Sequence, residues 1–372
     1  MVKREKVSSE ELVVSSDFVA SQQNLIGQSS DNSILTTPHS SLLTPHFKQL
    51  LDSKSCFKLI CGAGNENLEE IERLVALYAK SGCRFFDLSA SKEVLAAAQR
   101  GLDFAIPKEQ QKDYHFCISI GTKNDQHVQK AVIDPEKCKN CGKCVEICPQ
   151  DAISKQQMAN SRVGLLSHRY EIVGKNCIGC MKCQKVCEFD AISFHISHFT
   201  FHSLLTSHLS LFTCIELHAS DTDEAEVDEI WEYLNENFDG MLSLCLSRRK
   251  LSNEQVLNRI KRLIKDRKPY TTIIQADGSP MSGGEDDYKT TLQAVAMAEL
   301  VQSANLPVYV LLSGGTNSKT AQLANLCGVN FNGIAVGSYA RKIVKKYIER
   351  KDFFKNEAIF EEALKIARFL IK

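Results

Sequence analysis

Fifteen cysteines occur in this chain of 372 residues, and eight of them fall within the 50 residues from Cys138 to Cys187. A cysteine thiolate is a nucleophile, a metal ligand or one half of a disulfide. The basic residues after Met1 are not followed by an apolar stretch, so we expect no cleaved secretory signal and a cytoplasmic protein with reduced thiols. In a reducing compartment, closely spaced cysteines indicate metal ligands or catalytic groups.

The eight cysteines form an internal repeat. Residues 138–154, CKNCGKCVEICPQDAIS, align with residues 177–193, CIGCMKCQKVCEFDAIS, at an offset of 39, and nine of 17 positions are identical. Each copy reads C-x-x-C-x-x-C-x-x-x-C, a spacing typical of cysteines that ligate [4Fe–4S] clusters. The first three thiolates of each copy can hold three corners of one cubane, whereas the fourth points toward the other cluster.

This spacing predicts two [4Fe–4S] clusters with crossed ligation. The first is expected on Cys138, Cys141, Cys144 and Cys187, and the second on Cys177, Cys180, Cys183 and Cys148. Gly142 and Gly179 would let backbone N–H groups approach the cluster sulfurs. One alternative is a pair of zinc sites, because zinc also binds paired CxxC elements, and another is a pair of clusters that only brace the fold.

The block 131–195 resembles a bacterial-type two-[4Fe–4S] ferredoxin module, and the resemblance includes a DAIS strand after each motif. Pro149 follows the first motif, but Glu188 stands where the second motif would have proline. A carboxylate there would lower the reduction potential of the nearby cluster unless solvent screens its charge. Two neighbouring clusters of this kind would accept and pass single electrons.

The elements that must position this block begin at about residue 53, where short apolar runs alternate with amphipathic helices. Near-continuous apolar runs are typical of parallel strands covered on both faces. We predict strands at 57–62, 83–90, 114–122, 211–219, 240–248, 270–278, 307–315 and 332–339. Eight such units predict an α/β fold, a closed (β/α)8 barrel, with a doubly wound open sheet as the alternative.

The predicted barrel comprises residues 53–130 and 196–372, with residues 131–195 inserted after its third strand. The two barrel segments total 255 residues, close to the roughly 250 that closed barrels typically use. Polar residues 1–52 are expected to be a disordered or weakly ordered tail. The third helix would fall in 195–210, which has many Ser, His and β-branched residues, and a last helix at 356–372 should pack on the barrel exterior or end.

Reactive residues of such barrels lie at the carboxyl ends of the strands, and the inserted clusters should lie on that same face, the barrel mouth. Glycine-bearing turns after strands seven and eight lead into helices, whose N-termini commonly bind phosphate there. We therefore predict a phosphate or FMN site made by Ser313, Gly314, Gly315, Thr316 and Arg341, with Ser338 as a further donor. The glycines could instead only shape tight turns.

No catalytic residue is assigned. Glu216 and His218 share one face of a strand and are either a proton-transfer pair or a structural hydrogen-bonded pair. Cys61 is either a reactive thiol or a small buried hydrophobe, and residues 277–284 are either a lid over the mouth or a flexible connection. The other side chains expected at the mouth are Asn65, Asp87, Thr122, Lys123, Arg248, Arg249, Gln275, Asp277, Asn317, Tyr339 and Lys342.

Composition excludes several classes of function. The chain has 45 basic and 45 acidic side chains, so its charge supports neither nucleic-acid binding nor a polybasic membrane surface. It has no run of about 18 apolar residues, so we expect no membrane span.

Several segments are similar to one known family. The chain resembles the light-dependent period protein (LdpA) family of oxygen-evolving photosynthetic bacteria. The resemblance rests on the inserted two-cluster block and on three segments: FKLICGAGNENLEEIERLVALYAKSGCRFFDLSA, ADGSPMSGG and LSGGTNSKTAQLA. The resemblance runs from about residue 55 to the C-terminus and leaves the role of residues 1–50 open. It implies an iron–sulfur protein that passes the redox state of the cell, and through it light intensity, to the circadian clock. It also implies a clock-input histidine kinase and oscillator proteins as partners.

We therefore expect a redox-sensing regulatory protein in which two [4Fe–4S] clusters take electrons from the quinone pool or the photosynthetic chain. The barrel mouth offers no assigned nucleophile or acid–base pair, so an enzyme is the second reading. That alternative is a flavin-dependent oxidoreductase with FMN in the barrel and ferredoxin-type clusters. A plain electron carrier is the third possibility.

Overall fold

The computed structural model describes residues 44–125, 129–159, 166–196, 211–220, 223–278 and 285–371. The tail 1–43, most of the segment predicted to hold the third barrel helix, and most of the predicted lid lie outside these residues.

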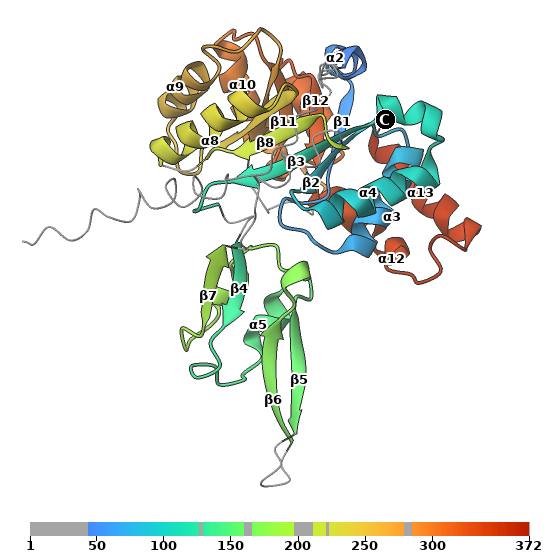
Figure 1. Cartoon of the computed structure of the whole chain (residues 1–372), viewed down its shortest axis with the longest axis vertical. Coiled ribbons are helices and arrows are strands. Elements are labelled where there is room, and N and C mark those ends of the chain that lie inside the picture. Colours follow the sequence, from blue (N-terminus) through green and yellow to red (C-terminus); the bar gives the residue numbers. More distant parts are fainter. Residues whose placement is uncertain are drawn as a thin grey trace, which may run out of the picture. The chain divides into compact units, whose positions relative to one another are not determined.

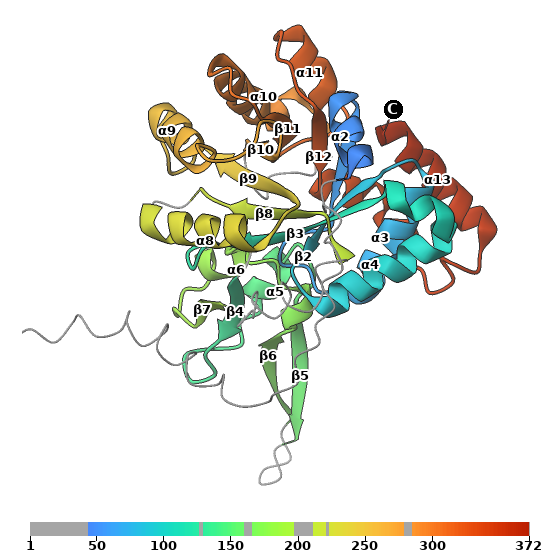
Figure 2. The same cartoon turned by 45° about the horizontal axis from the view of Figure 1, so that its top comes forward.

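Eight parallel strands close into a barrel, as predicted (Figures 1 and 2). Around the barrel the order is β1-β12-β11-β10-β9-β8-β3-β2, so the chain adds each new strand beside the previous one and β12 returns to pair with β1. The strands are β1 Cys56–Ile60, β2 Phe85–Ser89, β3 His115–Gly121, β8 Cys214–His218, β9 Met241–Ser247, β10 Thr272–Asp277, β11 Tyr309–Ser313 and β12 Gly333–Val336.

Nearly every residue of these strands is buried, because one set of alternate side chains fills the barrel interior and the other packs under the helices. The closed barrel is the finding here, and the doubly wound open sheet is excluded by the pairing of β1 with β12.

Helices lie outside the ring of strands (Figure 2). They are α3 Leu68–Lys80, α4 Lys92–Ala105, α8 Glu224–Asn237, α9 Asn253–Leu263, α10 Tyr288–Ser303, α11 Thr320–Leu326 and α12 Ser338–Ile348, with a 3-10 turn at Lys108–Asp113. Polar side chains fix several helix starts, since Asn67, Asp223 and Asp287 each accept a backbone N–H of the first turn. Ser252 and Gln255 form a capping box at the start of α9.

Helix α13, Glu357–Ile371, packs on the outside of the barrel against α3 and α12. Ala363, Leu364 and Ala367 form its buried face. Phe104 at the end of α4 contacts Phe354 and Phe360, and these aromatic contacts bring the last segment of the chain against the first helices of the barrel. The sequence-based prediction of an exterior helix is confirmed.

Residues 45–52 correct the predicted tail, because they form a helix, α2 Pro45–Asp52, rather than a weakly ordered segment. Pro45 occupies the first turn, and Thr44 accepts the N–H of Phe47. Phe47 and Leu51 are fully buried in a cluster with residues at the amino ends of the strands, including Cys56 and Phe85. Leu50 also packs against this cluster and is partly buried.

The insert is built from two strand pairs and two short helices. β4 Gln129–Ile133 pairs antiparallel with β7 Ile192–Ile196, and β5 Ile153–Ala159 pairs antiparallel with β6 Leu166–Ile172. The helices are α5 Lys143–Ile147 and α6 Lys182–Lys185, with a 3-10 turn at Gly174–Asn176. Both strands predicted from the DAIS repeats are present, as β5 and β7.

Candidate functional site

The eight motif cysteines are gathered into two separate cavities of the insert. One cavity is lined by Cys138, Cys141, Cys144 and Cys187. The other is lined by Cys148, Cys177, Cys180 and Cys183. In each set three cysteines come from one motif and the fourth from the other motif, which is the arrangement that crossed ligation requires. The rest of each lining is largely apolar, with Ile133 and Ile192 in the first cavity and Ile153 and Phe194 in the second.

The internal repeat extends to the backbone. Left-handed residues recur at the same offset as the cysteines, with Asn140 matching Gly179 and Gly142 matching Met181. These positions bend the chain between the first three cysteines of each motif, so that successive sulfurs turn toward one centre. In each copy glycine occupies one of the two left-handed positions. The other position is Asn140 in the first copy and Met181 in the second, and both have positive φ.

Backbone N–H groups point at four of the cysteine sulfurs. Ala152 and Ala191 donate to the sulfurs of Cys148 and Cys187 at 3.3 and 3.4 Å, again 39 residues apart. The remaining two donors are Ala131 to Cys177, and Asn140 to Cys138. The expected donors beside Gly142 and Gly179 are not among these bonds. Such N–H groups stabilise negative charge on sulfur.

The electrostatics of the cysteine sets fit a metal cluster. Burial first, and then the neighbouring Cys180 and Cys177, raise the pKa of the Cys183 thiol to about 12. Burial and the neighbouring Cys138 and Cys141 likewise raise the pKa of Cys144. Four thiolates can therefore converge here only around a positive centre, and the iron ions of a cuboidal cluster would supply that charge.

Glu188, the residue that replaces proline after the second motif, is exposed and forms an ion pair with the exposed Lys143. Solvent and this lysine both reduce the field of the carboxylate. The structure thus favours the alternative in which the charge of Glu188 is screened and has little effect on the reduction potential of the nearby cluster.

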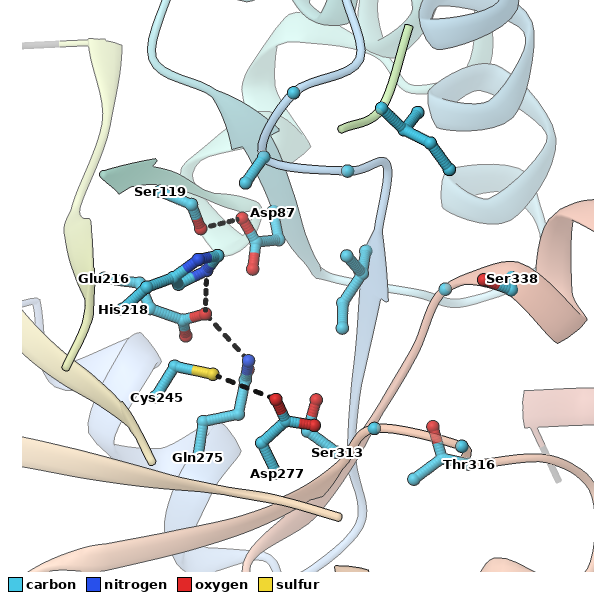
Figure 3. A pocket seen from close by; sticks show the side chains of 18 of the residues that line it. Asp87, Ser119, Glu216, His218, Cys245, Gln275, Asp277, Ser313, Thr316 and Ser338 are labelled. Atoms are coloured by element: carbon cyan, nitrogen blue, oxygen red, sulfur yellow. Dashed lines mark hydrogen bonds and ion pairs between the residues drawn. The ribbon is translucent and has the colours of Figure 1, made fainter. Parts of the chain in front are cut away.

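The barrel interior holds a buried ionic network centred on Lys58 of β1; Figure 3 labels three of its partners, Asp87, Glu216 and Gln275. Its Nζ atom lies 2.7 Å from Asp87 Oδ2 and 2.6 Å from Glu216 Oε2, and it donates to Gln275 Oε1 at 2.9 Å. Ser243 donates to the same Glu216 oxygen at 2.8 Å. Burial opposes ionisation of Glu216, but Lys58 and His218 together outweigh it and lower the pKa of that carboxyl. This network ties five strands of the barrel together and was not anticipated from the sequence.

His218 lies between two carboxylates. Its Nδ1 atom is 2.7 Å from Asp125 Oδ2, and its Nε2 atom is 3.5 Å from Glu216 Oε1. Burial lowers the pKa of His218, but Asp125 and Glu216 more than compensate and raise it well above its ordinary value. The predicted contact between Glu216 and His218 is present. Because Glu216 is also held by Lys58, Ser243 and Gln275, the geometry favours the structural reading of the pair.

The five residues of the predicted phosphate or FMN site, Ser313, Gly314, Gly315, Thr316 and Arg341, do line one cavity of about 120 Å³ at the mouth. Two of them are already engaged by the protein. Arg341 is 2.6 Å from Glu70 and donates to the carbonyl of Cys61, and Thr316 donates to the carbonyl of Ala335. A Cβ at Gly314 would lie 1.6 Å from Asp277 Oδ1, so this glycine, at φ 70°, makes room for a carboxylate.

The other candidate residues separate into two groups. Asp87, Gln275, Asp277 and Ser338 line the same cavity, as do two residues missed from the sequence, Ser119 and Cys245. The remaining candidates do not line this cavity; they are Cys61, Asn65, Thr122, Lys123, Arg248, Arg249, Asn317, Tyr339 and Lys342. Cys61 is fully buried and burial raises its pKa, so it behaves as a small buried hydrophobe rather than a reactive thiol.

The second cysteine cavity adjoins the barrel mouth. Ile178, the residue after Cys177, lines both cavities. Lys130 donates to the carbonyl of Cys177 at 2.7 Å and to the carbonyl of Gly64 in the loop after β1, and lies 4.0 Å from Glu66. Burial lowers the pKa of this lysine, and Glu66 partly opposes that effect.

Comparison with known proteins gives two family matches. Residues 137–191 match the model of the 4Fe-4S dicluster domain, which favours iron–sulfur clusters over zinc in the cysteine block. Residues 209–372 match the Light dependent period A C-terminal domain. In the part of the chain that is described, no helix is both long and apolar enough to cross a membrane.

One curated relative and two solved structures illustrate the similarity. Light dependent period A of Synechococcus elongatus is 28% identical over 314 residues, which cover 81% of this chain and 84% of that protein. Dihydrodipicolinate synthase from Oceanobacillus iheyensis has a TM-score of 0.39 at 11% identity, covering 86% of this chain and 80% of that one. Truncated 3-deoxy-D-arabino-heptulosonate 7-phosphate synthase from Thermotoga maritima has a TM-score of 0.41 at 10% identity, covering 84% and 83%.

The strand pairing establishes the barrel, and the two matched domains cover the insert and the carboxyl half of that barrel. With the long alignment to the Synechococcus elongatus protein, they support the resemblance first read from the motifs: the chain carries a 4Fe-4S dicluster domain and is similar to the light-dependent period A family.

Proposed function

We propose that this protein is a redox sensor in which two [4Fe–4S] clusters report the electron supply of the cell to regulatory partners. The first cluster would be held by Cys138, Cys141, Cys144 and Cys187, and the second by Cys177, Cys180, Cys183 and Cys148. The observation that carries the proposal is this sorting of the eight sulfurs into two cavities, each combining both motifs. Bound clusters supply one-electron chemistry, and the chain supplies the ligands and the surface that responds.

Lys130 is the residue best placed to pass the state of the second cluster to the barrel. Its ammonium group bridges the carbonyl of Cys177, inside the cluster motif, and the carbonyl of Gly64, at the barrel mouth. The side chain is mostly buried, so water screens its charge poorly. An added electron on the cluster would strengthen the pull on Lys130 and weaken its hold on the loop after β1.

The size of this effect is sufficient for signalling. One unit of charge at an effective dielectric near 20 changes the energy of groups within several ångströms by about 1–4 kcal/mol. A change of that size shifts a conformational or binding equilibrium by roughly fivefold or more, and about 1.4 kcal/mol suffices for tenfold. The mouth loop and the cluster face are therefore the surfaces that a partner would read.

The relative is named for light-dependent period control, and we propose the same role here. A clock-input histidine kinase and oscillator proteins would be the partners, and the quinone pool or the photosynthetic chain would donate electrons. The protein would act in the cytoplasm as a regulator and not as an enzyme.

The test compares partner binding by the oxidised and the reduced protein, prepared without oxygen and with both clusters loaded. We expect affinity for a clock-input kinase to differ about tenfold between the two states. Lys130→Met should reduce that difference while iron content and barrel folding are kept. Equal affinities in both states, with normal cluster reduction, would rule out sensing and leave a plain electron carrier.

The flavin-dependent alternative receives less support. Sites for drug-sized ligands usually enclose roughly 300–1,000 Å³, whereas the mouth cavity formed by the described residues measures about 120 Å³. Arg341, the expected phosphate partner, is paired with Glu70, and Asp277 lies beside Gly314. A phosphate would therefore meet carboxylates where the sequence predicted open donors. Stoichiometric FMN in the purified protein would restore this alternative.

A further inference from the structure

Three metal-binding side chains that belong to neither cysteine motif converge at the barrel mouth. They are Glu216 and His218 on β8 and Cys245 on β9 (Figure 3). We propose that they bind one divalent transition-metal ion, zinc in the reducing cell. A thiolate, an imidazole and a carboxylate form a donor set that zinc accepts, whereas magnesium and calcium prefer oxygen alone.

The distances fit this ion. One ligand atom from each of the three side chains lies within 4.8 Å of the other two. His218 Nε2 and Glu216 Oε1 are 3.5 Å apart. Tetrahedral zinc, with bonds of about 2.0–2.3 Å, places its ligand atoms roughly 3.3–3.8 Å from one another. Small rotations of Cys245 would therefore complete a three-ligand set without moving the strands.

The surrounding hydrogen bonds orient these groups as they do in metal sites. His218 Nδ1 lies 2.7 Å from Asp125 Oδ2, so the imidazole is held with Nε2 turned toward Glu216. Histidine ligands of metals nearly always donate their other ring N–H to a carboxylate, a backbone carbonyl or a water molecule. Glu216 is fixed through its Oε2 atom by Lys58 and Ser243, and its other oxygen, Oε1, accepts from Gln275 Nε2 at 2.7 Å and faces His218. The two ligands on β8 are thus already positioned before an ion arrives.

The charge at the mouth favours a cation. Among the described residues, four carboxylates, from Asp87, Asp125, Glu216 and Asp277, stand against two cationic groups, the ammonium of Lys58 and the imidazolium of His218. Arg341 does not change this balance because Glu70 neutralises it. The mouth therefore attracts a cation, which is the opposite of the anion site expected from the glycine turns.

The fourth position of the ion would face the mouth cavity. Asp277 lines that cavity, and its Oδ2 atom accepts the thiol of Cys245 at 3.7 Å, so this carboxylate can serve as a fourth ligand. Binding would displace two protons to solvent, one from the Cys245 thiol and one from His218 Nε2, and leave a thiolate and a neutral imidazole on the ion. The site is separate from the clusters, so it can be tested while they remain intact.

The experiment uses anaerobically purified full-length protein with its iron in place, freed of loosely bound metal with a chelator and then titrated with Zn²⁺. We expect one zinc per chain at unchanged iron content. X-ray absorption at the zinc edge should show one sulfur at about 2.3 Å, with nitrogen and oxygen at about 2.0–2.2 Å. Absence of stoichiometric zinc, or a zinc bound by several sulfurs, would overturn the proposal.

Three variants locate the ion. Cys245→Ser should abolish the zinc–sulfur signal. Cys214→Ser is the control: it replaces a buried cysteine at the other end of β8, and this variant should bind zinc like the wild type. Asp125→Asn should weaken zinc binding about 10–100-fold, as loss of a carboxylate behind a ligating histidine does. Circular dichroism and iron content confirm that each variant is folded. Wild-type zinc affinity in Asp125→Asn, or an unchanged sulfur signal in Cys245→Ser, would refute the assignment.

Discussion

Cys187 lines the same cavity as Cys144, although 43 residues separate the two in the chain. Cys187 belongs to the second motif, whose other three cysteines lie in the neighbouring cavity. The two motifs therefore exchange their last cysteines, and neither could complete a four-sulfur set alone. This exchange gives the first prediction.

Cys187→Ser should damage the cluster bound by the first motif, and Cys148→Ser the cluster bound by the second, because each residue lines the cavity of the other motif. Wild-type protein prepared without oxygen should hold about eight iron and eight sulfide per chain, from two four-iron cubanes. Paramagnetic resonance of the reduced variants, compared with Cys141→Ser and Cys180→Ser, identifies the cluster that is lost. A Cys187→Ser spectrum matching Cys180→Ser would show local ligation instead.

Lys130→Met should lower the reduction potential of the cluster bound beside Cys177. The lysine donates to the carbonyl of Cys177, so its removal takes away a positive charge that favours the reduced state. A loss of about 1.4 kcal/mol corresponds to roughly 59 mV for a one-electron couple, and we expect a decrease of that order. Potentiometric titration of the wild type and the variant measures it.

Glu188→Gln is the matched control for Lys130→Met, since it also changes one charge near the cysteine block. Its carboxylate is exposed and paired with Lys143, so we expect a much smaller change in either cluster potential. If Glu188→Gln shifted a potential as much as Lys130→Met, the argument from burial would be wrong.

Lys58→Met should destabilise the barrel by about 3–5 kcal/mol, because it leaves Asp87 and Glu216 buried side by side without their shared cation. Urea unfolding followed by the fluorescence of Trp231, the one tryptophan of the chain, reports on the barrel. Adding Glu216→Gln to this variant should recover part of the loss. A cost below about 1 kcal/mol for Lys58→Met would mean that the ionic network contributes little.

Stability of the barrel should fall as the pH drops from about 6.5 to 4 because of His115. Burial lowers the pKa of this histidine to about 4, while Asp113 partly opposes the shift. An unfolded histidine titrates near 6.5, so in this window the unfolded chain binds the extra proton and is favoured. The contribution is complete above about pH 6.5 and amounts to about 3 kcal/mol across the window.

His115→Phe tests this origin, because phenylalanine keeps a ring against Phe47 but cannot titrate. The difference in unfolding free energy between the wild type and the variant should change by about 3 kcal/mol between pH 7 and pH 4, while contributions common to both proteins cancel. A constant difference over that range would exclude His115 as the source.

Much of the fold could be predicted from sequence, because its signals are local. Runs such as those of β9 and β10 are apolar throughout, and a strand buried on both faces requires that pattern wherever it lies. The cysteine repeat was equally informative, since ligand spacing within a motif is set by the short loop itself. Even the exchange of Cys148 and Cys187 followed from the longer last spacing of each motif.

The barrel mouth could not be predicted in the same way. From the sequence, Lys58 was treated as part of an apolar strand. A lysine inside such a run does indicate a buried ion pair, and this was the signal that could have revealed the network. Its partners come from β2, β8 and β10, and nothing in the sequence says which of their alternate side chains turn inward at the same height. Cys245 was missed for the same reason.

The sequence by itself determined which cysteines share a cavity and the number of barrel strands, because spacing within a motif and apolarity within a strand act over a few residues. Only the closed barrel decided the charge of the mouth. The sequence suggested that Arg341 was free to bind phosphate, but in the folded barrel this residue of α12 is paired with Glu70. It also suggested that Gly314 was a phosphate-binding glycine, but Asp277 at the end of β10 lies beside it. The net charge of the barrel mouth is the sum of charged groups from many strands. These groups come together only when the strands close into a barrel.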